Sequence, residues 1–456
     1  MLALEPTPLG AHRPGAARAD LREIDGRTVA YAEVDGLRPG GSGAAEADTV
    51  GRALELAEQL GCPVVVKIVS VAIDPQAAGL DGLVAWGRVA RRAVRLSGVV
   101  PLLVVVNGPV HGGLALILGL ADHVVMTRSA TAYLNGPGPV RRVTGVSVTP
   151  EELGSATIHA TRSNVATMIA EDDDDADLAV AELLAHLPDN YLAPALVPPS
   201  TDPADRRSSV AARTVPDGAK QSYDVRHVLA DVFDHDSLLE VNADHAPNLV
   251  CAYARLGGIS VAIVANQPFV RAGTLDIAAS CKGARHVRCA DALGLPLITF
   301  VDTPGYEPGR DLEWRGMIRH GAKLVHAYAS ATVPRIAVII RKAYGGAYIV
   351  MDSRTMGNDL VLAWPTAQIA VMGAAGAVAI LNRRELAAAD DPELARVALE
   401  SAYEERYCTP EIAAEHGLVD AVIDPADTRR HLVAGVRRLA NKRPHIPPRA
   451  HDNGPL

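Results

Sequence analysis

Two Gly-Gly pairs, each following an apolar stretch, constrain the fold of this chain more than any other feature. Gly345-Gly346 follows a predicted buried strand at 337–340 and precedes a predicted helix. Gly112-Gly113 has the same setting 233 residues earlier (345 − 112 = 233). A strand that turns through paired glycines into a helix leaves main-chain N–H groups without intrahelical partners. Each turn can therefore hold an anionic oxygen with amides alone.

The same offset recurs at other turns and prolines, which indicates an internal duplication. The matched positions are Gly26 and Gly258 (232 apart), Pro63 and Pro296 (233), Pro101 and Pro334 (233), and Gly136 and Gly373 (237). The offset grows by four after the glycine pairs, as one small insertion would cause. A constant offset over several landmarks predicts two copies of one domain of about 200 residues.

Length and composition agree with two α/β domains. The chain has 456 residues, more than a single core usually supports. Its hydrophobic content of 48% includes only 4% aromatic residues, which suits β-branched strands covered by Ala-rich helices. We expect a mobile N-terminal arm (1–20), a first domain (21–187), a linker rich in Pro, Ser and Asp (188–221), a second domain (222–441) and a tail (442–456).

Charge, cysteine usage and hydropathy exclude several classes of protein. The net charge of −9 argues against a general nucleic-acid binder. Five scattered cysteines without a C-x-x-C pair predict reduced thiols in a cytoplasmic protein and no structural zinc site. We expect Cys281 and Cys289 to pack in the core. The first twenty residues lack signal-peptide character, and prolines and glycines break the apolar stretch at 97–121, so we expect no membrane span.

Local patterns predict the elements around the glycine pairs. Alternation around Asp25-Gly26 predicts a hairpin. The other predictions are helices at 53–60, 83–96 and 178–187, a helix within 223–239, strands at 64–69, 124–126 and 131–134, and a hairpin at 256–264. Residues 40–43 (GGSG) form either a ligand-facing turn or a plain loop. The acidic run at 171–175 suggests a metal cluster, but such a run more often precedes a helix N-terminus, whose dipole it complements.

No Ser or Cys nucleophile lies at the second glycine turn, so a hydrolase elbow is excluded there. Longer stretches of the second half form distinctive motifs, namely VDTPGYEPG, RHGAKLVHAYASATVPRIAVIIRKAYGGAYIVM and LAWPTAQIAVMGAAGAV. The first half contributes SGVVP, GPVHGG and LLAHLPDN. Together these motifs resemble the carboxyltransferase β subunit of biotin-dependent acyl-CoA carboxylases of the propionyl-CoA carboxylase type. The resemblance runs from residue 21 to the end of the chain.

The resemblance implies an α/β fold of two tandem crotonase-like domains and a hexamer, a trimer of dimers, whose sites lie between the first domain of one subunit and the second of its partner. It implies carboxyl transfer from carboxybiotin on a carrier protein to the α-carbon of an acyl-CoA. Both reactants then develop oxyanion character, and each needs aimed N–H donors. By similarity, Gly112 and Gly113 supply one set for the thioester, and Gly346 and Ala347 supply the other for biotin. We expect the chain to bind no metal ion. It has no P-loop motif, so we also expect it to bind no ATP, and ATP use would belong to the biotin carboxylase partner.

The resemblance also implies further site residues. The substrate side comprises Ile349, Tyr348, Gly136, Gly373, Ala374 and Gly376, and the biotin side comprises Gly305, Tyr344 and Trp364. Ile349 would limit the acyl chain to acetyl or propionyl size, or only fill the helix core. Trp364 would line the cleft or interface, or only pack. His111 is either a polar site group or a buried neutral histidine, and we favour a non-catalytic role.

The first domain departs from the family at the CoA side. The Gly-Ala-Arg motif expected there is replaced by SVAIDPQ at 70–76, and the stretch after Gly113 is LALI. The second domain therefore carries the stronger match. Two alternatives to a carboxyltransferase stay open at this point: an acyl-CoA decarboxylase of the same fold, and a non-catalytic partner subunit that has lost CoA binding.

Overall fold

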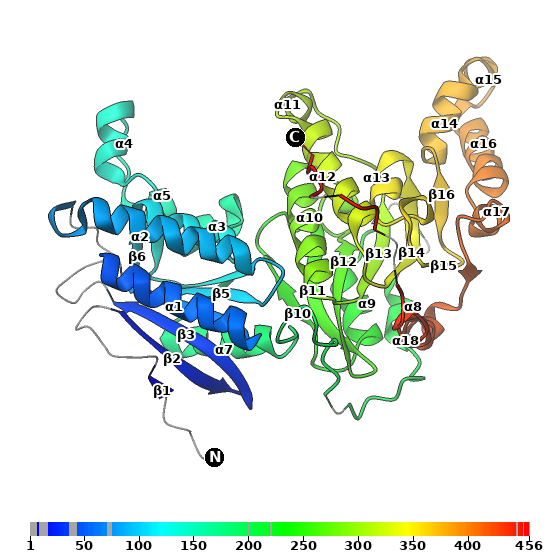
Figure 1. The fold of residues 1–456 in the computed structure, drawn as a ribbon. Helices are drawn as coiled ribbons and strands as arrows, with labels where there is room; N and C mark the ends of the chain where they lie inside the picture. Colours follow the sequence, from blue (N-terminus) through cyan, green and yellow to red (C-terminus); the bar gives the residue numbers. More distant parts are fainter. Residues whose placement is uncertain are drawn as a thin grey trace. The chain divides into compact units, whose positions relative to one another are not determined.

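The structure, a computed structural model, describes residues 7–8, 17–35, 43–70, 75–198, 200–216, 218, 221–443, 446–449 and 451–455. It divides into two compact units (Figure 1). Unit 1 holds the described residues up to Leu196, together with Val241–His245 and Ala292–Gly294. Unit 2 holds Val197–Glu240, Ala246–Asp291 and the chain from Leu295 onward.

Unit 1 is a mixed sheet of order β1-β2-β3-β4-β5-β7-β9 with helices packed on it. Its strands are β1 (Thr7–Pro8), β2 (Ala17–Ile24), β3 (Arg27–Asp35), β4 (Val64–Ser70), β5 (Leu102–Val106), β7 (His123–Thr127) and β9 (Met168–Ala170), and a separate pair is formed by β6 (Pro109–His111) and β8 (Thr131–Tyr133). Its helices are α1 (Ala44–Leu60), α2 (Pro75–Leu96), η1 (Gly112–Ala115), α3 (Leu116–Leu120), α4 (Pro137–Thr144), α5 (Pro150–Gly154), α6 (Ala156–Ile158), η2 (His159–Ser163) and α7 (Asp173–Leu184).

Unit 2 has a sheet of order β10-β11-β12-β13-β14-β15-β17, with β16 added to β14. Its strands are β10 (Leu239–Val241), β11 (Leu249–Leu256), β12 (Ile259–Asn266), β13 (Leu297–Thr303), β14 (Arg335–Tyr344), β15 (Leu360–Ala363), β16 (Gln368–Ala370) and β17 (Ala421–Val422). Its helices are α8 (Ser209–Thr214), α9 (Val225–Val232), η3 (Arg271–Gly273), α10 (Ile277–Ala292), α11 (Arg310–Trp314), α12 (Met317–Ser330), α13 (Gly345–Val350), η4 (Arg354–Met356), α14 (Ala374–Leu381), α15 (Arg383–Ala388), α16 (Pro392–Tyr407), α17 (Pro410–Glu415), η5 (Pro425–Asp427) and α18 (Thr428–Leu439).

The strand registers confirm the duplication residue by residue. Val64 pairs with Leu102 in unit 1, and Leu297 pairs with Arg335 in unit 2, so both members shift by 233 (297 − 64 and 335 − 102). The two hairpins, Ile24 with Arg27 and Leu256 with Ile259, shift by 232. In the next pair of strands, Pro109 pairs with Thr131 in unit 1, and Lys342 pairs with Gln368 in unit 2. The offset is 233 from Pro109 to Lys342 and 237 from Thr131 to Gln368. The insertion of four therefore lies between the glycine turn and the next strand.

Most of the predicted elements are present, with corrected bounds. The first hairpin begins at Ala17, inside the segment expected to be an arm, and the helix expected at 178–187 is α7, which begins at Asp173. Of the predicted glycine loop at 40–43, residues 40–42 lie outside the described residues. Cys289 is buried in α10 as expected, whereas Cys281 on the same helix is partly exposed.

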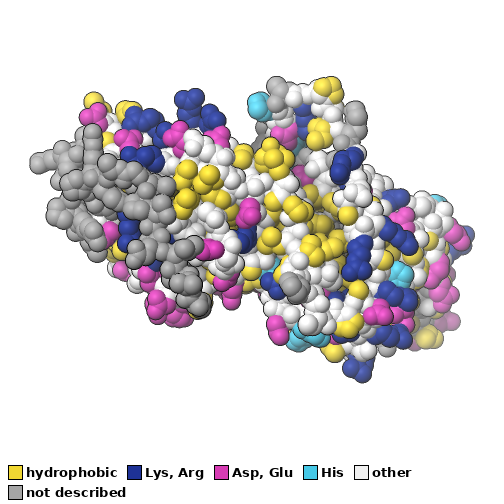
Figure 2. All heavy atoms as spheres, turned by 60° about the horizontal axis from the view of Figure 1, so that its bottom comes forward, with side chains coloured by type: hydrophobic (Ala, Val, Ile, Leu, Met, Phe, Trp, Pro, Cys, Tyr) yellow, Lys and Arg dark blue, Asp and Glu magenta, His cyan; other side chains and the backbone are white. Residues whose placement is uncertain are grey.

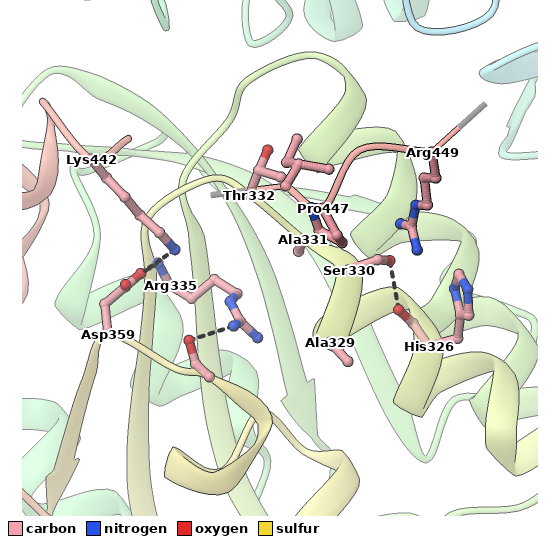
Figure 3. Close-up of a pocket in the computed structure, with 12 residues that line it drawn as sticks. His326, Ala329, Ser330, Ala331, Thr332, Arg335, Asp359, Lys442, Pro447 and Arg449 are labelled. Atoms are coloured by element: carbon pink, nitrogen blue, oxygen red, sulfur yellow. Dashed lines mark hydrogen bonds and ion pairs between the residues drawn. The ribbon is translucent and has the colours of Figure 1, made fainter. Parts of the chain in front are cut away.

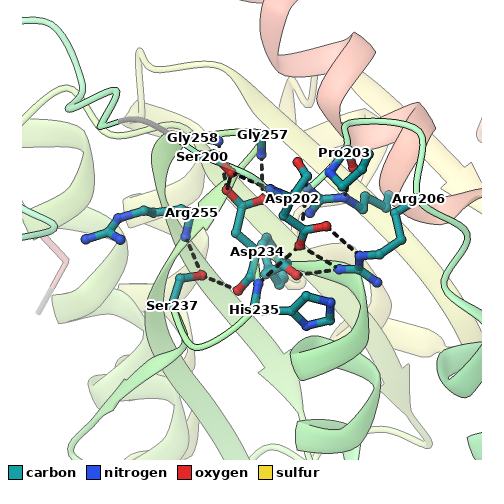
Figure 4. Close-up of polar contacts among 12 residues, drawn as sticks. Ser200, Asp202, Pro203, Arg206, Asp234, His235, Ser237, Arg255, Gly257 and Gly258 are labelled. Atoms are coloured by element: carbon teal, nitrogen blue, oxygen red, sulfur yellow. Dashed lines mark hydrogen bonds and ion pairs between the residues drawn. The ribbon is translucent and has the colours of Figure 1, made fainter.

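Part of the segment predicted to be a linker is built into unit 2. Helix α8 packs on α9, and Ala211 joins the apolar core of this unit. Buried ion pairs hold the preceding residues (Figure 4). Arg429, which has no exposed surface, donates to Asp234 at 2.7 Å and to the Pro203 carbonyl at 2.9 Å, and Asp234 accepts from Ser200 at 3.0 Å. This network fixes the path of the chain from Ser200 to Arg206 along unit 2.

The surface carries both signs of charge. On the face drawn in Figure 2, Lys and Arg side chains lie among Asp and Glu, with apolar patches between them. Such mixing agrees with the argument against a general nucleic-acid binder. In the described ranges, no helix combines the length and hydropathy that crossing a bilayer requires.

Candidate functional site

The second glycine turn joins the longest strand of unit 2 to a short helix. Strand β14 ends at Tyr344, and Gly345 then adopts φ +57° to start α13. A Cβ at Gly345 would lie 3.1 Å from the Val371 carbonyl oxygen, so both the dihedral angle and the contact require glycine. Gly346 and Ala347 follow in the first turn of α13, where helix geometry leaves N–H groups unpaired.

The first glycine turn repeats this local geometry in unit 1. Strand β6 ends at His111, and Gly112 adopts φ +74° at the start of η1. A Cβ at Gly113 would meet no atom within 4 Å, so the main chain here is open to approach. Both glycine pairs therefore turn through the left-handed region at their first member.

Exposed main-chain amides follow the left-handed glycine in both turns. Outside their own helical turns, the amides of Gly113, Gly346 and Ala347 have no acceptor among the described residues. Gly113 and Gly346 are exposed, and the first amides of a helix lack intrahelical partners, so these donors are open to an external acceptor. The role of Gly112, Gly113, Gly346 and Ala347 in stabilising negative charge stays a prediction.

A mainly apolar cavity of about 410 Å³ adjoins the second turn within unit 2. Helix α12 supplies one wall and α13 the other. The lining residues are Tyr306, Glu313, Met317, Ile318, Gly321, Ala322, Val325, Gly346, Ile349 and Val350. Ile349 is 45% exposed and borders the cavity, as expected for a residue that meets a ligand. Tyr306 was not predicted as a site residue, although it lies next to the predicted Gly305.

Two of the other predicted glycines pack against tyrosines next to these turns. Gly136 and Gly373 are the N-caps of α4 and α14, the equivalent helices of the two units. A Cβ at Gly373 would lie 2.9 Å from the Tyr344 ring, and one at Gly136 would lie 3.2 Å from the Tyr133 ring. Close packing of an aromatic ring thus explains both glycines. Ala374 is buried, whereas Gly376, two residues further along α14, is exposed.

The residues predicted for the biotin side divide between the core and the turn. Trp364 is 1% exposed, and its Nε1 donates to the Thr428 hydroxyl at 2.9 Å, so its side chain belongs to the core. Tyr344 is nearly buried and donates to Gln368. Gly305 has φ +142° and its carbonyl accepts from the Leu275 amide at 3.1 Å.

Tyr348 was predicted for the substrate side. Its hydroxyl is buried without a partner among the described residues.

His111 is held in place by an aromatic neighbour. Its ring stacks on Tyr133 with centroids 4.3 Å apart and planes inclined by 14°. Burial lowers the pKa of His111, so the ring is neutral at pH 7. Its Nε2 has no partner in the described part of the chain. A neutral, stacked ring agrees with the packing interpretation of His111.

The acidic run has partners in the protein. Asp172 caps α7 by accepting from the Asp175 amide at 3.0 Å. Asp173 forms an ion pair at 2.6 Å with Lys67, whose side chain is 6% exposed. No group of three or more His, Cys, Asp or Glu residues among those described is arranged to hold a metal ion. Sequence reasoning missed Lys67, although a single lysine within the apolar strand VVVKIVS signals a buried ion pair.

A second cavity, of about 450 Å³, lies at the C-terminal end of α12 (Figure 3). Its two most buried cations have carboxylate partners. Lys442 pairs with Asp359 at 2.7 Å, and Arg335 pairs with Asp352 at 2.8 Å and donates to the Tyr328 carbonyl at 2.7 Å. Arg335 and Lys442 neutralise these carboxylates, and Arg335 satisfies a carbonyl in the last turn of α12, so both cations have structural roles.

Comparison with known proteins agrees with this geometry. The carboxyl transferase domain family matches residues 19–454. The propionyl-CoA carboxylase carboxyltransferase subunit of Haloferax mediterranei is 44% identical over 437 residues, covering 95% of this chain and 84% of the relative. The methylmalonyl-CoA carboxyltransferase 12S subunit of Propionibacterium freudenreichii subsp. shermanii is 43% identical over 434 residues, covering 95% and 82%.

A solved structure matches the fold of the whole chain. It is a transcarboxylase 12S crystal structure, described as a hexamer assembly with methylmalonyl-coenzyme A and methylmalonic acid bound. Its TM-score is 0.92 at 41% identity, covering 97% of this chain and 85% of that one. The two units are therefore crotonase-like domains, and the paired amide turns belong to an enzyme that transfers a carboxyl group. The chain belongs to the carboxyl transferase family, as a carboxyltransferase subunit of the propionyl-CoA carboxylase type.

Proposed function

We propose that this chain transfers a carboxyl group between carboxybiotin, carried by a partner protein, and the α-carbon of a short-chain acyl-CoA. The products are malonyl-CoA from acetyl-CoA and methylmalonyl-CoA from propionyl-CoA. The observation that carries the proposal is the pair of equivalent left-handed glycine turns, each of which opens a helical turn with an exposed second glycine. Two nucleophilic partners each develop an oxyanion in this reaction, so two sets of donors are required.

The residues at each turn have separate tasks. Gly112 and Gly113 hold the thioester oxygen of the acyl-CoA and stabilise its enolate. Gly346 and Ala347 hold the ureido oxygen of biotin, which supplies the transferable carboxyl group. The adjoining apolar cavity fits a ring of this kind, because its walls carry mostly aliphatic side chains with few polar groups. The acyl group must meet biotin at the mouth of this cavity for the transfer, and Ile349 at its border restricts the length of the acyl chain there.

The partners follow from the same chemistry. A biotin carboxylase and carrier subunit must supply carboxybiotin, with ATP used there. The related 12S protein assembles as a hexamer, and we propose a hexamer here, a trimer of dimers, in which the first domain of one subunit meets the second domain of its partner. The chain acts in the cytoplasm, without a metal ion of its own.

One experiment tests the activity directly. The purified chain is mixed with a biotin carboxylase and carrier subunit, ATP, bicarbonate, and acetyl-, propionyl- or butyryl-CoA. We expect carboxylated product from acetyl- and propionyl-CoA, at rates that depend on the biotinylated carrier. A chain that binds the acyl-CoA but yields only carrier-independent loss of CO₂ from malonyl-CoA would instead be a decarboxylase. A chain that binds no CoA in calorimetry would be a non-catalytic subunit.

A further inference from the structure

Tyr306 combines three features that point to a ligand-facing role beside the second glycine turn. It lies on the loop between β13 and α11. Main-chain hydrogen bonds of the residues before and after it hold this loop in place. The Leu275 amide donates to the Gly305 carbonyl at 3.1 Å, and the Glu307 amide donates to the Leu275 carbonyl at 2.9 Å. A side chain carried on such a fixed main chain keeps its direction without help from its own polar atom.

Two glycines on two helices make room for its ring. A Cβ at Gly321 of α12 would lie 3.2 Å from the Tyr306 hydroxyl and 3.4 Å from its Cζ. A Cβ at Gly346 of α13 would lie 3.7 Å from the Cε2 on the other edge of the ring. The ring therefore lies between the two helices, with its hydroxyl beside Gly321 of α12 and its Cε2 edge beside Gly346 of α13.

The hydroxyl is open to the cavity. Tyr306 lines it together with Gly346 and Ile349. Within the described residues its oxygen bonds to no protein group, and it is not sealed from solvent. The other tyrosines of this region differ, because Tyr344 donates to Gln368 and the Tyr348 oxygen is enclosed. Burial raises the pKa of Tyr306 to about 12, so its hydroxyl keeps its proton at pH 7 and can donate.

We propose that the Tyr306 hydroxyl donates a hydrogen bond to the ligand oxygen held by the Gly346 and Ala347 amides. Resting on the proposed function, this makes Tyr306 a third donor for the ureido oxygen of biotin. A side-chain donor next to two main-chain donors stabilises the charge that develops on this oxygen as the carboxyl group leaves or arrives. It acts on the transition state more than on the bound ligand, because the charge is largest there.

The test uses the half-reaction that this chain performs without its partner. Methylmalonyl-CoA donates the carboxyl group to free biotin: the bond from the α-carbon to the carboxyl carbon breaks and an N–C bond to biotin forms. The ureido proton goes to the α-carbon, so the products are propionyl-CoA and carboxybiotin. Wild type, Tyr306→Phe and Tyr253→Phe are compared. The Tyr253 hydroxyl contacts the Cys289 sulfur in the core and lies outside the cavity.

We expect Tyr306→Phe to lower kcat by about 10- to 100-fold, with the KM for biotin changed by less than about threefold. Tyr253→Phe should leave both constants near wild type. Gly321→Ala serves as a second variant, because its methyl group displaces the hydroxyl while the ring remains. It should lower kcat in the wild-type background and add nothing to Tyr306→Phe.

Two outcomes are distinguishable. An active wild type whose kcat is unchanged in Tyr306→Phe overturns the role of Tyr306 and leaves the proposed function standing. A wild type that carboxylates neither free biotin nor the acyl-CoA overturns both. If Tyr306→Phe does not fold, the Gly321→Ala variant decides: unchanged kcat there overturns the proposal.

Discussion

Gly112 and Gly345 are equivalent residues 233 positions apart, and both adopt a left-handed main chain, at φ +74° and +57°. Each follows the last residue of a strand and starts a helical turn. Their equivalence shows that the amide turn was present before the duplication and that both copies kept it. In both copies the residues after this glycine open a helical turn, whose first amides have no intrahelical partner and are the donors that the proposed function uses.

The first prediction concerns the second of these glycines. In Gly345→Ala, a left-handed alanine costs about 1 kcal/mol, and the new methyl group would lie 3.1 Å from the Val371 oxygen. The turn must shift, and the amides of Gly346 and Ala347 lose their direction. We expect carboxyl transfer to fall by about 100-fold or more, as for the loss of an oxyanion donor. Steady-state kinetics with propionyl-CoA and carboxylated carrier measures this loss.

Gly417→Ala is the matched control for that experiment. Gly417 has φ +69°, and a Cβ there would meet nothing within 4 Å. Both variants place an alanine in a left-handed conformation, so thermal unfolding should show a similar decrease in Tm for the two. Only Gly345→Ala should lose activity. Equal activity in the two variants would contradict a catalytic role for the second turn.

The sequence predicted the duplication and both turns because these depend on local geometry. A left-handed residue requires glycine, and offsets between glycines and prolines survive when side chains change. The cavity beside the second turn could not be predicted, because it depends on how α12 and α13 pack. Tyr306 reaches it only since Gly321 leaves room on another helix. Trp364 differs from Tyr306, because its motif suggested a position in the cleft or interface, or a packing role. In the structure its side chain is buried in the core.

The linker shows a different limit of sequence reasoning. Pro, Ser and Asp at 188–221 have the composition of a flexible connection. The structure nevertheless contains α8 there, and Asp202 and Arg206 form an ion pair at 2.7 Å next to Arg429. Arg429, more than two hundred positions away, pairs with Asp202 and donates to the Pro203 carbonyl, and no local pattern in the sequence predicts these contacts.

The second prediction concerns the choice of acyl-CoA. Ile349→Ala removes aliphatic volume at the border of the cavity, so longer acyl chains gain room. We expect the ratio of kcat/KM for butyryl-CoA to that for propionyl-CoA to rise by about 10-fold. Val397→Ala on α16, which is 59% exposed and lies outside the cavity, is the control and should leave this ratio unchanged. A ratio that stays constant in Ile349→Ala would show that Ile349 only packs.

The third prediction concerns the buried ion pairs of Figure 4. Arg429→Met leaves the carboxylate of Asp234, which is 6% exposed, without its 2.7 Å partner. Breaking a buried pair by removing one partner costs about 3 to 5 kcal/mol. Urea unfolding should therefore show a much lower midpoint. Arg430→Met, whose side chain is 58% exposed, breaks a surface pair with Asp427 and should cost less than about 1 kcal/mol. Similar midpoints for the two variants would contradict this account.

The last prediction concerns acid stability and His286 of α10. This side chain is buried, and its Nε2 lies 3.2 Å from the Ala252 carbonyl oxygen, to which a neutral ring donates. Burial lowers the pKa of His286 to about 4, whereas an unfolded histidine titrates near 6.5. Between these values the unfolded chain binds a proton that the folded chain does not, so stability falls as pH decreases from 6.5 to 4, by about 3 kcal/mol. Urea unfolding at pH 7 and pH 5 should show this loss in wild type and less of it in His286→Gln. The surface variant His416→Gln should behave as wild type, and an equal pH dependence in all three chains would refute the assignment.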